Sequence, residues 1–460
     1  PLRGGAPLAD LQDVRGGRCG AGLVQVKLGL GRAWFLGYDL LQVIATLRHG
    51  SGRLDELPDG AMGSLAGPRH LYSYFELSDK LPRDVPVADL HQDLLRTLLL
   101  EALAATPLPR LWHFPGGAPA LWFVKGDGCG EAGAEVEVEV VERGGAYLSF
   151  YRPRESRHSG ALMREWRSRG HGISVEADLN HITQARPPGS ARGSPTAADL
   201  NQHALGAIRG ELEAHRDAFF RETSLETDTL CIHSCQWTGA PMARLVHDLG
   251  WHTPTHFISH DPRMQWGQGY GPYMIPTALP MRYFEPGVGL QPIWHLPAQW
   301  DESQTLGRYA ELVVEKPPSW PGFQQFPDSR SFLVALEPAR ARGMVGLTAE
   351  DYGAVLARFG HEAATRWHGV QICNFHPIYV AIPQDHPRAS RRALELGLAG
   401  AQAAGCRFAN LEDWSRFLRA RAGLRLAGWR QQANVDRIEL VSAAPLKELA
   451  LLLPGFVTRV

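Results

Sequence analysis

The sequence is poor in several features that mark large classes of proteins. Its 47 Lys and Arg nearly balance its 48 Asp and Glu, so the formal net charge is only −1 at pH 7. Such a chain lacks the broad positive field with which proteins usually bind nucleic acids or anionic membranes. Only five of the basic residues are lysines, a bias more typical of a source genome than of a phosphate-binding surface. We therefore expect no nucleic acid among its partners.

Long apolar runs and cysteines are also scarce. The longest candidate for a membrane span, residues 98–105, contains Glu101 and is far shorter than the roughly 18 apolar residues that a spanning helix needs. The six cysteines are scattered and too few for a disulfide framework in 460 residues. These absences predict a globular protein without a membrane span, and they leave its compartment and oligomeric state open.

The length and the local patterns predict several domains. At roughly 100–200 residues per domain, 460 residues correspond to two to four domains. Changes of pattern divide the chain into an α/β domain at 1–115, a larger unit at 116–421 and a small β-rich domain at 422–460. Residues 23–39 are typical of two strands joined by a turn, and no partner strand is predicted upstream. We therefore expect that sequence is missing before Pro1.

The larger unit has the pattern of a barrel. Short β-rich runs alternate with helical stretches, which is typical of βα units around a parallel sheet or barrel. Seven strands over about 300 residues match an α/β barrel, where the chemistry lies at the C-terminal ends of the strands. Residues 135–140 alternate Glu and Val with period two, but their position between glycines favours the first barrel helix. The predicted strands are 120–124, 146–151, 172–176, 229–233, 255–259, 292–296 and 370–375, and the main helices 159–169, 197–222, 240–249, 348–367 and 388–404.

Polar residues follow three of the predicted strands. Asp127 comes after the first strand in a glycine-rich stretch, His233 ends the fourth, and His376 follows the seventh. Each of them alone could be a turn residue or a hydrogen-bonded structural histidine. Because a barrel gathers its strand ends in one mouth, three such residues at equivalent places indicate a metal or proton-transfer site.

This arrangement resembles the polysaccharide deacetylase family of carbohydrate esterases over about residues 118–420. The resemblance implies an irregular seven-stranded (β/α) barrel that binds a divalent metal, with zinc as the first choice. Asp127 is similar to the family's first motif, in which one Asp acts as base and a second binds the metal. His233 is similar to the second motif, where two His complete the metal site.

Two later motifs complete the resemblance. Residues 278–282 are similar to the arginine motif, which implies that Arg282 orients the catalytic Asp. Residues 374–377 are similar to the last motif, which implies that His376 serves as the acid. Asp127, Arg282 and His376 are therefore the candidate catalytic residues.

The sequence also departs from the family pattern. Asp127 is not followed by a second acid, and Trp237 stands where the second His should follow His233. A metal site needs at least three protein ligands. Cys129, Glu176 or a neighbouring histidine, His181, could supply the third, since zinc accepts S, O or N donors. Otherwise the site has decayed.

Aromatic residues in the strand-to-helix connections are candidates for substrate binding. Trp237, Tyr273 and Trp294 could stack on sugar rings, although packing in the core or in loops is the alternative for each.

The opening segment has a weaker resemblance. Residues 29–40 are similar to the late strands of a class I glutamine amidotransferase-like domain, which is a flavodoxin-like α/β unit. Cys19 has no suitable His and acid partners in the sequence for a nucleophile. The resemblance therefore implies a partial, non-catalytic domain.

These observations lead to one functional hypothesis and two alternatives. The leading hypothesis is a hydrolase that removes acetyl groups from a glycan or sugar derivative by metal-assisted attack of water. The second is a non-catalytic glycan-binding or scaffolding protein on a decayed barrel. The third is a glycoside hydrolase that pairs Asp127 with Glu131 or Glu176, since such enzymes use two carboxyl groups about 5–10 Å apart.

Overall fold

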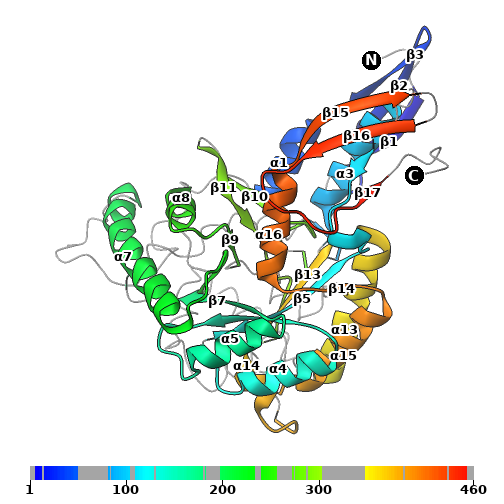
Figure 1. Ribbon diagram of the computed structural model, residues 1–460. Coiled ribbons are helices and arrows are strands. Elements are labelled where there is room, and N and C mark those ends of the chain that lie inside the picture. Colours follow the sequence, from blue (N-terminus) through cyan, green and yellow to red (C-terminus); the bar gives the residue numbers. More distant parts are fainter. Residues whose placement is uncertain are drawn as a thin grey trace, which may run out of the picture.

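The computed structural model of the protein describes fifteen segments of the chain, and all structural statements below refer to them. A curled parallel sheet lies at the centre and is surrounded by helices (Figure 1). The described residues are 6–12, 15–49, 81–82, 84–103, 109–128, 131–179, 182, 197–233, 240–255, 272–273, 275–285, 288–302, 348–386, 389–432 and 435–452.

The central sheet has the strand order β12-β13-β5-β6-β7-β8-β9, and every neighbouring pair is parallel. A further strand, β14, pairs with the first residues of β5. The predicted seven-stranded (β/α) barrel is thus confirmed in part, since the described strands form a curled parallel half-barrel sheet of seven strands. The strands are β5 (Leu121–Asp127), β6 (Leu148–Arg152), β7 (Gly172–Ala177), β8 (Thr229–Ile232), β9 (Thr253–Pro254), β12 (Trp300–Asp301), β13 (Val370–Phe375) and β14 (Arg407–Phe408).

Helices that follow the strands pack around this sheet (Figure 1). The alternating Glu/Val segment forms one of them, α4, as predicted. Val138 and Val141, three residues apart, are both buried on it, and Glu135 lies in its first turn, where a negative charge is favourable. The helices are α4 (Ala134–Arg143), α5 (Gly160–Ser168), α7 (Ala197–Thr223), α8 (Ala240–Asp248), α13 (Ala349–Glu362), η6 (Ala363–Trp367), α14 (Pro377–Ala381), α15 (Arg391–Ala403) and α16 (Leu411–Ala422).

The predicted strand at 292–296 does not belong to the barrel sheet. Residues Gly289–His295 form β11, which pairs antiparallel with β10 (Met281–Glu285) in a separate two-stranded sheet. The edge position of the central sheet is taken instead by β12. With two residues, β12 is too short for a periodic pattern to reveal it. The predicted strand at 255–259 lies outside the described residues except for Thr255, and β9 ends just before it.

The N-terminal segment contains an antiparallel sheet. The predicted hairpin is present as β2 (Arg18–Leu28) and β3 (Gly31–Leu36), and α1 (Leu40–His49) and α3 (Val87–Ala102) follow. The expectation that no strand lies upstream is wrong, because β1 (Ala6–Gln12) pairs with β2. The described strands do not form the parallel sheet of a flavodoxin-like unit, so the amidotransferase-like resemblance is not confirmed.

The C-terminal segment is rich in strands, as predicted. Strands β15 (Arg425–Gln432) and β16 (Val435–Val441) form an antiparallel hairpin. Strand β17 (Leu451–Leu452) pairs with β4 (Arg110–Leu111), which lies just before the short helix η2 (Pro115–Gly117), so residues 451–452 lie beside the start of the barrel segment. The domain limits at 115 and 421 remain predictions. Among the described residues, no helix has the length and apolar character needed to cross a bilayer.

The two faces of the central sheet are both buried, and this determines where polar side chains can emerge. On β5, Trp122 and Val124 join one apolar cluster, while Leu121 and Phe123 join another. Successive side chains of a strand point to opposite faces. Lys125 and Asp127 therefore lie on the same face as Leu121 and Phe123, at the C-terminal end of β5. All seven residues of β5 are buried, so this strand carries polar groups into the interior.

Candidate active site

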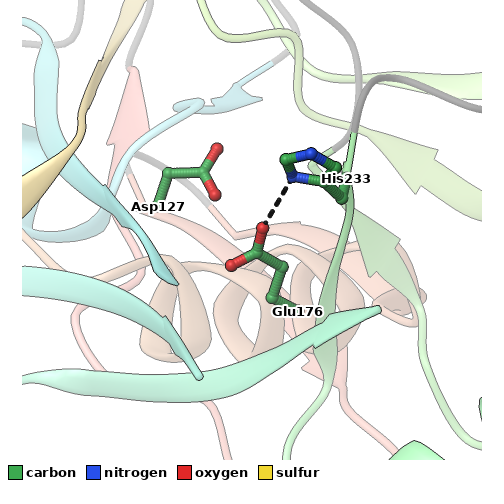
Figure 2. Close-up of side chains that lie close together, drawn as sticks. All are labelled: Asp127, Glu176 and His233. Carbon is green, nitrogen blue, oxygen red and sulfur yellow. Dashed lines mark hydrogen bonds and ion pairs between the residues drawn. The ribbon is translucent and has the colours of Figure 1, made fainter. Parts of the chain in front are cut away.

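Three possible metal ligands meet at the C-terminal edge of the central sheet. Asp127 is the last residue of β5, Glu176 lies on β7 and His233 follows β8 directly. The ligand atoms of these three residues all lie within 4.8 Å of one another. His233 Nδ1 is 3.0 Å from Glu176 Oε1, and Figure 2 shows the three side chains turned toward a common space. The sheet thus gathers donors from three βα units.

Two oxygens of this group accept no hydrogen bond from the described residues. Asp127 Oδ1 and Glu176 Oε2 are both buried, and no N–H or alcohol group of the described residues donates to either. Burying a carboxylate oxygen in this way is costly unless another group or an ion pairs with it. Two carboxylates and one imidazole form a donor set that zinc and similar divalent cations accept. The residues present therefore fit a divalent cation.

The two carboxyl groups differ in their affinity for protons. Burial, and next the negative charge of Asp127, raise the pKa of Glu176 to about 8. Burial alone would also raise the pKa of Asp127, but the positive charges of Lys125 and then His376 hold it well below its usual value. In the absence of a cation, Asp127 is therefore the more acidic of the two carboxyl groups.

A buried lysine, two residues before Asp127 on β5, contacts this group of possible metal ligands. Lys125 Nζ donates to Asn374 Oδ1 at 2.6 Å and to Asp127 Oδ2 at 3.3 Å. Asn374 Nδ2 in turn donates to Asp301 Oδ2 at 2.9 Å. Lys125 also lies over the ring of Tyr151, with Nζ 5.3 Å from the ring centroid. One continuous chain of contacts therefore links β5, β13 and β12.

A histidine and a glutamate form a second group beside the first. His376 follows β13 and precedes α14, and its Nδ1 lies 2.7 Å from Glu302 Oε1. Its Nε2 lies 4.0 Å from Asp127 Oδ2. Asp301, Glu302 and His376 also bring their ligand atoms within 4.8 Å of one another. Burial raises the pKa of Glu302, and the neighbouring His376 acts in the opposite direction.

The structure thus brings together four residues that sequence analysis singled out. Asp127, Glu176 and His233 form the first group, and His376 lies at its border. Of the three candidates for a third ligand, Glu176 lies in this group. Cys129 and His181 lie outside the described residues, as does the proposed sugar-stacking residue Trp237.

Two other predicted site residues make their described contacts elsewhere. Arg282 lies on the β10–β11 hairpin, where its Nε donates to the carbonyl oxygen of Gln291 and its guanidinium packs on Trp294. Lys125, which sequence analysis did not select, contacts Asp127 with its ammonium group at 3.3 Å. Tyr273 is only 1% exposed and its hydroxyl accepts a hydrogen bond from Gln371, so it offers no free ring face to a sugar.

Trp294 remains a candidate for sugar binding. Its side chain is half-buried, and its backbone N–H donates to the carbonyl oxygen of His252.

Sequence analysis missed three functional candidates. Lys125 follows directly on the apolar run 120–124, and this position at the predicted strand end could have marked it. Asn374 lies within a recognised motif but had no assigned role. Glu302 had no comparable signal, since the strand before it has only two residues.

Some solved structures have a fold similar to that of this chain. No protein-family model matches the chain, and no curated protein matches it either. Among solved structures, a candidate polysaccharide deacetylase of Mycobacterium smegmatis is 13% identical with a TM-score of 0.44, over 69% of this chain and 96% of the other. A polysaccharide deacetylase of Bacillus cereus is 11% identical with a TM-score of 0.32, over 65% and 94%.

A third similar structure has a more specific description. The catalytic domain of a peptidoglycan N-acetylglucosamine deacetylase of Eubacterium rectale is 11% identical with a TM-score of 0.30, over 67% of this chain and 94% of the other. These likenesses concern the general fold, and no assignment of residues or activity rests on them.

Proposed function

We propose that the protein is a metal-dependent hydrolase that removes acetyl groups from a glycan. The observation that carries the proposal is the pair of buried oxygens, Asp127 Oδ1 and Glu176 Oε2, which accept no hydrogen bond from the described residues and lie close to His233. The acetylated glycan as substrate is inferred from the motif resemblance of Asp127, His233 and residues 374–377.

Asp127, Glu176 and His233 would hold the cation. A divalent cation supplies Lewis acidity to such a site, which makes water a stronger acid and polarises a carbonyl group. Zinc suits the combination of carboxylate oxygens with an imidazole nitrogen. The burial of Glu176 and Asp127 keeps bulk water away from the charges on which this chemistry depends.

His376 is the residue placed to move protons. Glu302 holds Nδ1, which leaves Nε2 facing the side of Asp127 where water and substrate would meet. In the neutral ring, Nε2 accepts a proton from water as the water oxygen bonds to the acetyl carbon. It then donates that proton to the nitrogen or oxygen of the sugar as the bond to the acetyl carbon breaks. The products are acetate and a free amine or hydroxyl.

The geometry gives less support to a glycoside hydrolase. Oxygens of Asp127 and Glu176 crowd together around His233, which suits a shared cation better than a sugar between two carboxylates. Glu131, the other proposed partner, accepts hydrogen bonds from the hydroxyl of Ser156 and the backbone N–H of Arg157. Its carboxylate therefore binds the loop between β6 and α5.

Acetate release tests the proposal. The zinc-loaded full chain is incubated with N-acetylglucosamine oligomers and with O-acetylated xylan, and free acetate is measured. We expect His233→Ala and His376→Ala to lower the rate at least about 100-fold. His361→Ala, an exposed histidine on α13, serves as the matched control with the rate of the unmodified protein.

Each alternative has its own outcome. Glycan binding without acetate release would favour the non-catalytic protein, and new reducing ends would favour the glycoside hydrolase. Either result would overturn the proposal.

A further inference from the structure

A single lysine connects the two acidic groups of the candidate active site. Lys125 is 3% exposed, and its ammonium group contacts both Asp127 and Asn374. Asn374 contacts Asp301, a member of the second group. A buried ammonium with two oriented acceptors is fixed in place, unlike the mobile head group of a surface lysine.

The two oxygens of Asp127 have different surroundings. Oδ2 accepts the hydrogen bond of Lys125 and faces Nε2 of His376. Oδ1 accepts no hydrogen bond from the described residues. A carboxylate held by one oxygen cannot rotate freely about its last bond, so the contact with Lys125 leaves Oδ1 available to the ion that Glu176 and His233 would share.

We propose that Lys125 is the positioning residue of Asp127, and that Asn374 in turn positions Lys125. The motif resemblance assigned this role to Arg282, which instead lies on the β10–β11 hairpin. The inference rests on the proposed function in one respect, namely that a cation binds beside Asp127. A misplacement of about 1 Å at a catalytic group can cost about 100-fold in rate, so this contact has a measurable consequence.

Three substitutions separate positioning from a merely structural role. Lys125→Met keeps the length of the side chain and removes its charge, whereas Lys125→Arg keeps the charge. Lys27→Met, on the exposed end of β2, is the matched control. We measure kcat and KM of acetate release, the visible spectrum of the protein loaded with Co²⁺ alone, and the crystal structure of each variant without metal.

The expected pattern is specific to positioning. Lys125→Met lowers kcat about 100-fold while KM changes less than about threefold, and it alters the cobalt spectrum because Asp127 turns. The crystal structure shows the carboxylate of Asp127 in a new orientation. Lys125→Arg recovers part of kcat, and Lys27→Met behaves like the unmodified protein.

Contrary results are equally clear. An unchanged orientation of Asp127 in crystals of Lys125→Met would overturn the inference, as would unchanged kcat and cobalt spectrum. If the unmodified protein binds no cobalt and releases no acetate, the proposed function fails, while the orientation of Asp127 still decides the role of Lys125. If Lys125→Met does not fold, Asn374→Leu replaces it: a turned Asp127 supports the inference and an unchanged one overturns it.

Discussion

Oε1 of Glu302 lies 2.7 Å from Nδ1 of His376 and also accepts the backbone N–H of the same residue. One buried oxygen thus fixes both the ring and the backbone of the histidine that would move protons. A carboxylate in this position selects the tautomer with Nδ1–H and stabilises the ring when it becomes positively charged.

Replacement of Glu302 by glutamine tests this relationship. Glu302→Gln removes the negative charge and is expected to lower kcat of acetate release about 100-fold, because the ring loses its fixed tautomer and its charge partner. Zinc stoichiometry should stay the same, since the glutamate is not one of the three proposed ligands. Glu350→Gln, at an exposed position of α13, is the control. An unchanged kcat in Glu302→Gln would contradict the assigned role of His376.

A second buried glutamate is a cost to stability. Glu137, on α4, has no exposed surface, and both of its carboxyl oxygens accept no hydrogen bond from the described residues. Glu137→Leu removes this unpaired polar group, so we expect the free energy of unfolding at neutral pH to rise by about 1–3 kcal/mol. Urea denaturation measures the change. Glu139→Leu, exposed on the same helix, should stay within about 0.5 kcal/mol.

The same substitution has a predicted pH dependence. Burial, and next the charge of Glu302, raise the pKa of Glu137 well above its ordinary value of 4.5. A group with a raised pKa in the folded state favours folding most below its unfolded pKa and loses that contribution as pH rises through the folded pKa. The gain from Glu137→Leu should therefore grow as pH rises above 4.5. An equal gain at every pH would show that the pKa of Glu137 is the same in the folded and unfolded states.

The turn after β5 leaves no room for a side chain. A Cβ at Gly128 would lie 2.7 Å from Glu176 Oε2 and closer still to the carbonyl oxygen of Tyr151. Gly128→Ala should lower the free energy of unfolding by about 1–3 kcal/mol and weaken zinc binding in calorimetry, because Glu176 must move. Gly206→Ala, on α7 with open space around it, is expected to raise stability by about 0.5–1 kcal/mol. Equal effects of the two substitutions would show that the turn tolerates a side chain.

Much of the barrel could be predicted because its strands carry local signals. Residues 370–375 form β13 with the predicted limits, since six buried residues end at a proline after His376. Because parallel strands end at one edge of the sheet, the sequence alone predicted that Asp127 and His233 lie close together. Their ligand atoms do lie within 4.8 Å of each other. These inferences need only the pattern along the chain.

The remaining features depend on which strands are neighbours. The contact of Lys125 with Asn374 exists because β5 pairs with β13, although 249 positions separate the two residues. No periodic pattern reveals this pairing or the two-residue strand before Glu302. Arg282 shows another side of this dependence, since its motif-like stretch lies on a hairpin outside the central sheet.

Anomalous diffraction from crystals of the full chain soaked in zinc gives the most direct test of the metal site. The account predicts a single strong peak at about 2.0–2.3 Å from one oxygen of Asp127, one oxygen of Glu176 and one ring nitrogen of His233. A map with no peak among these three side chains, or with Asp127 and His233 bound to different ions, would contradict it.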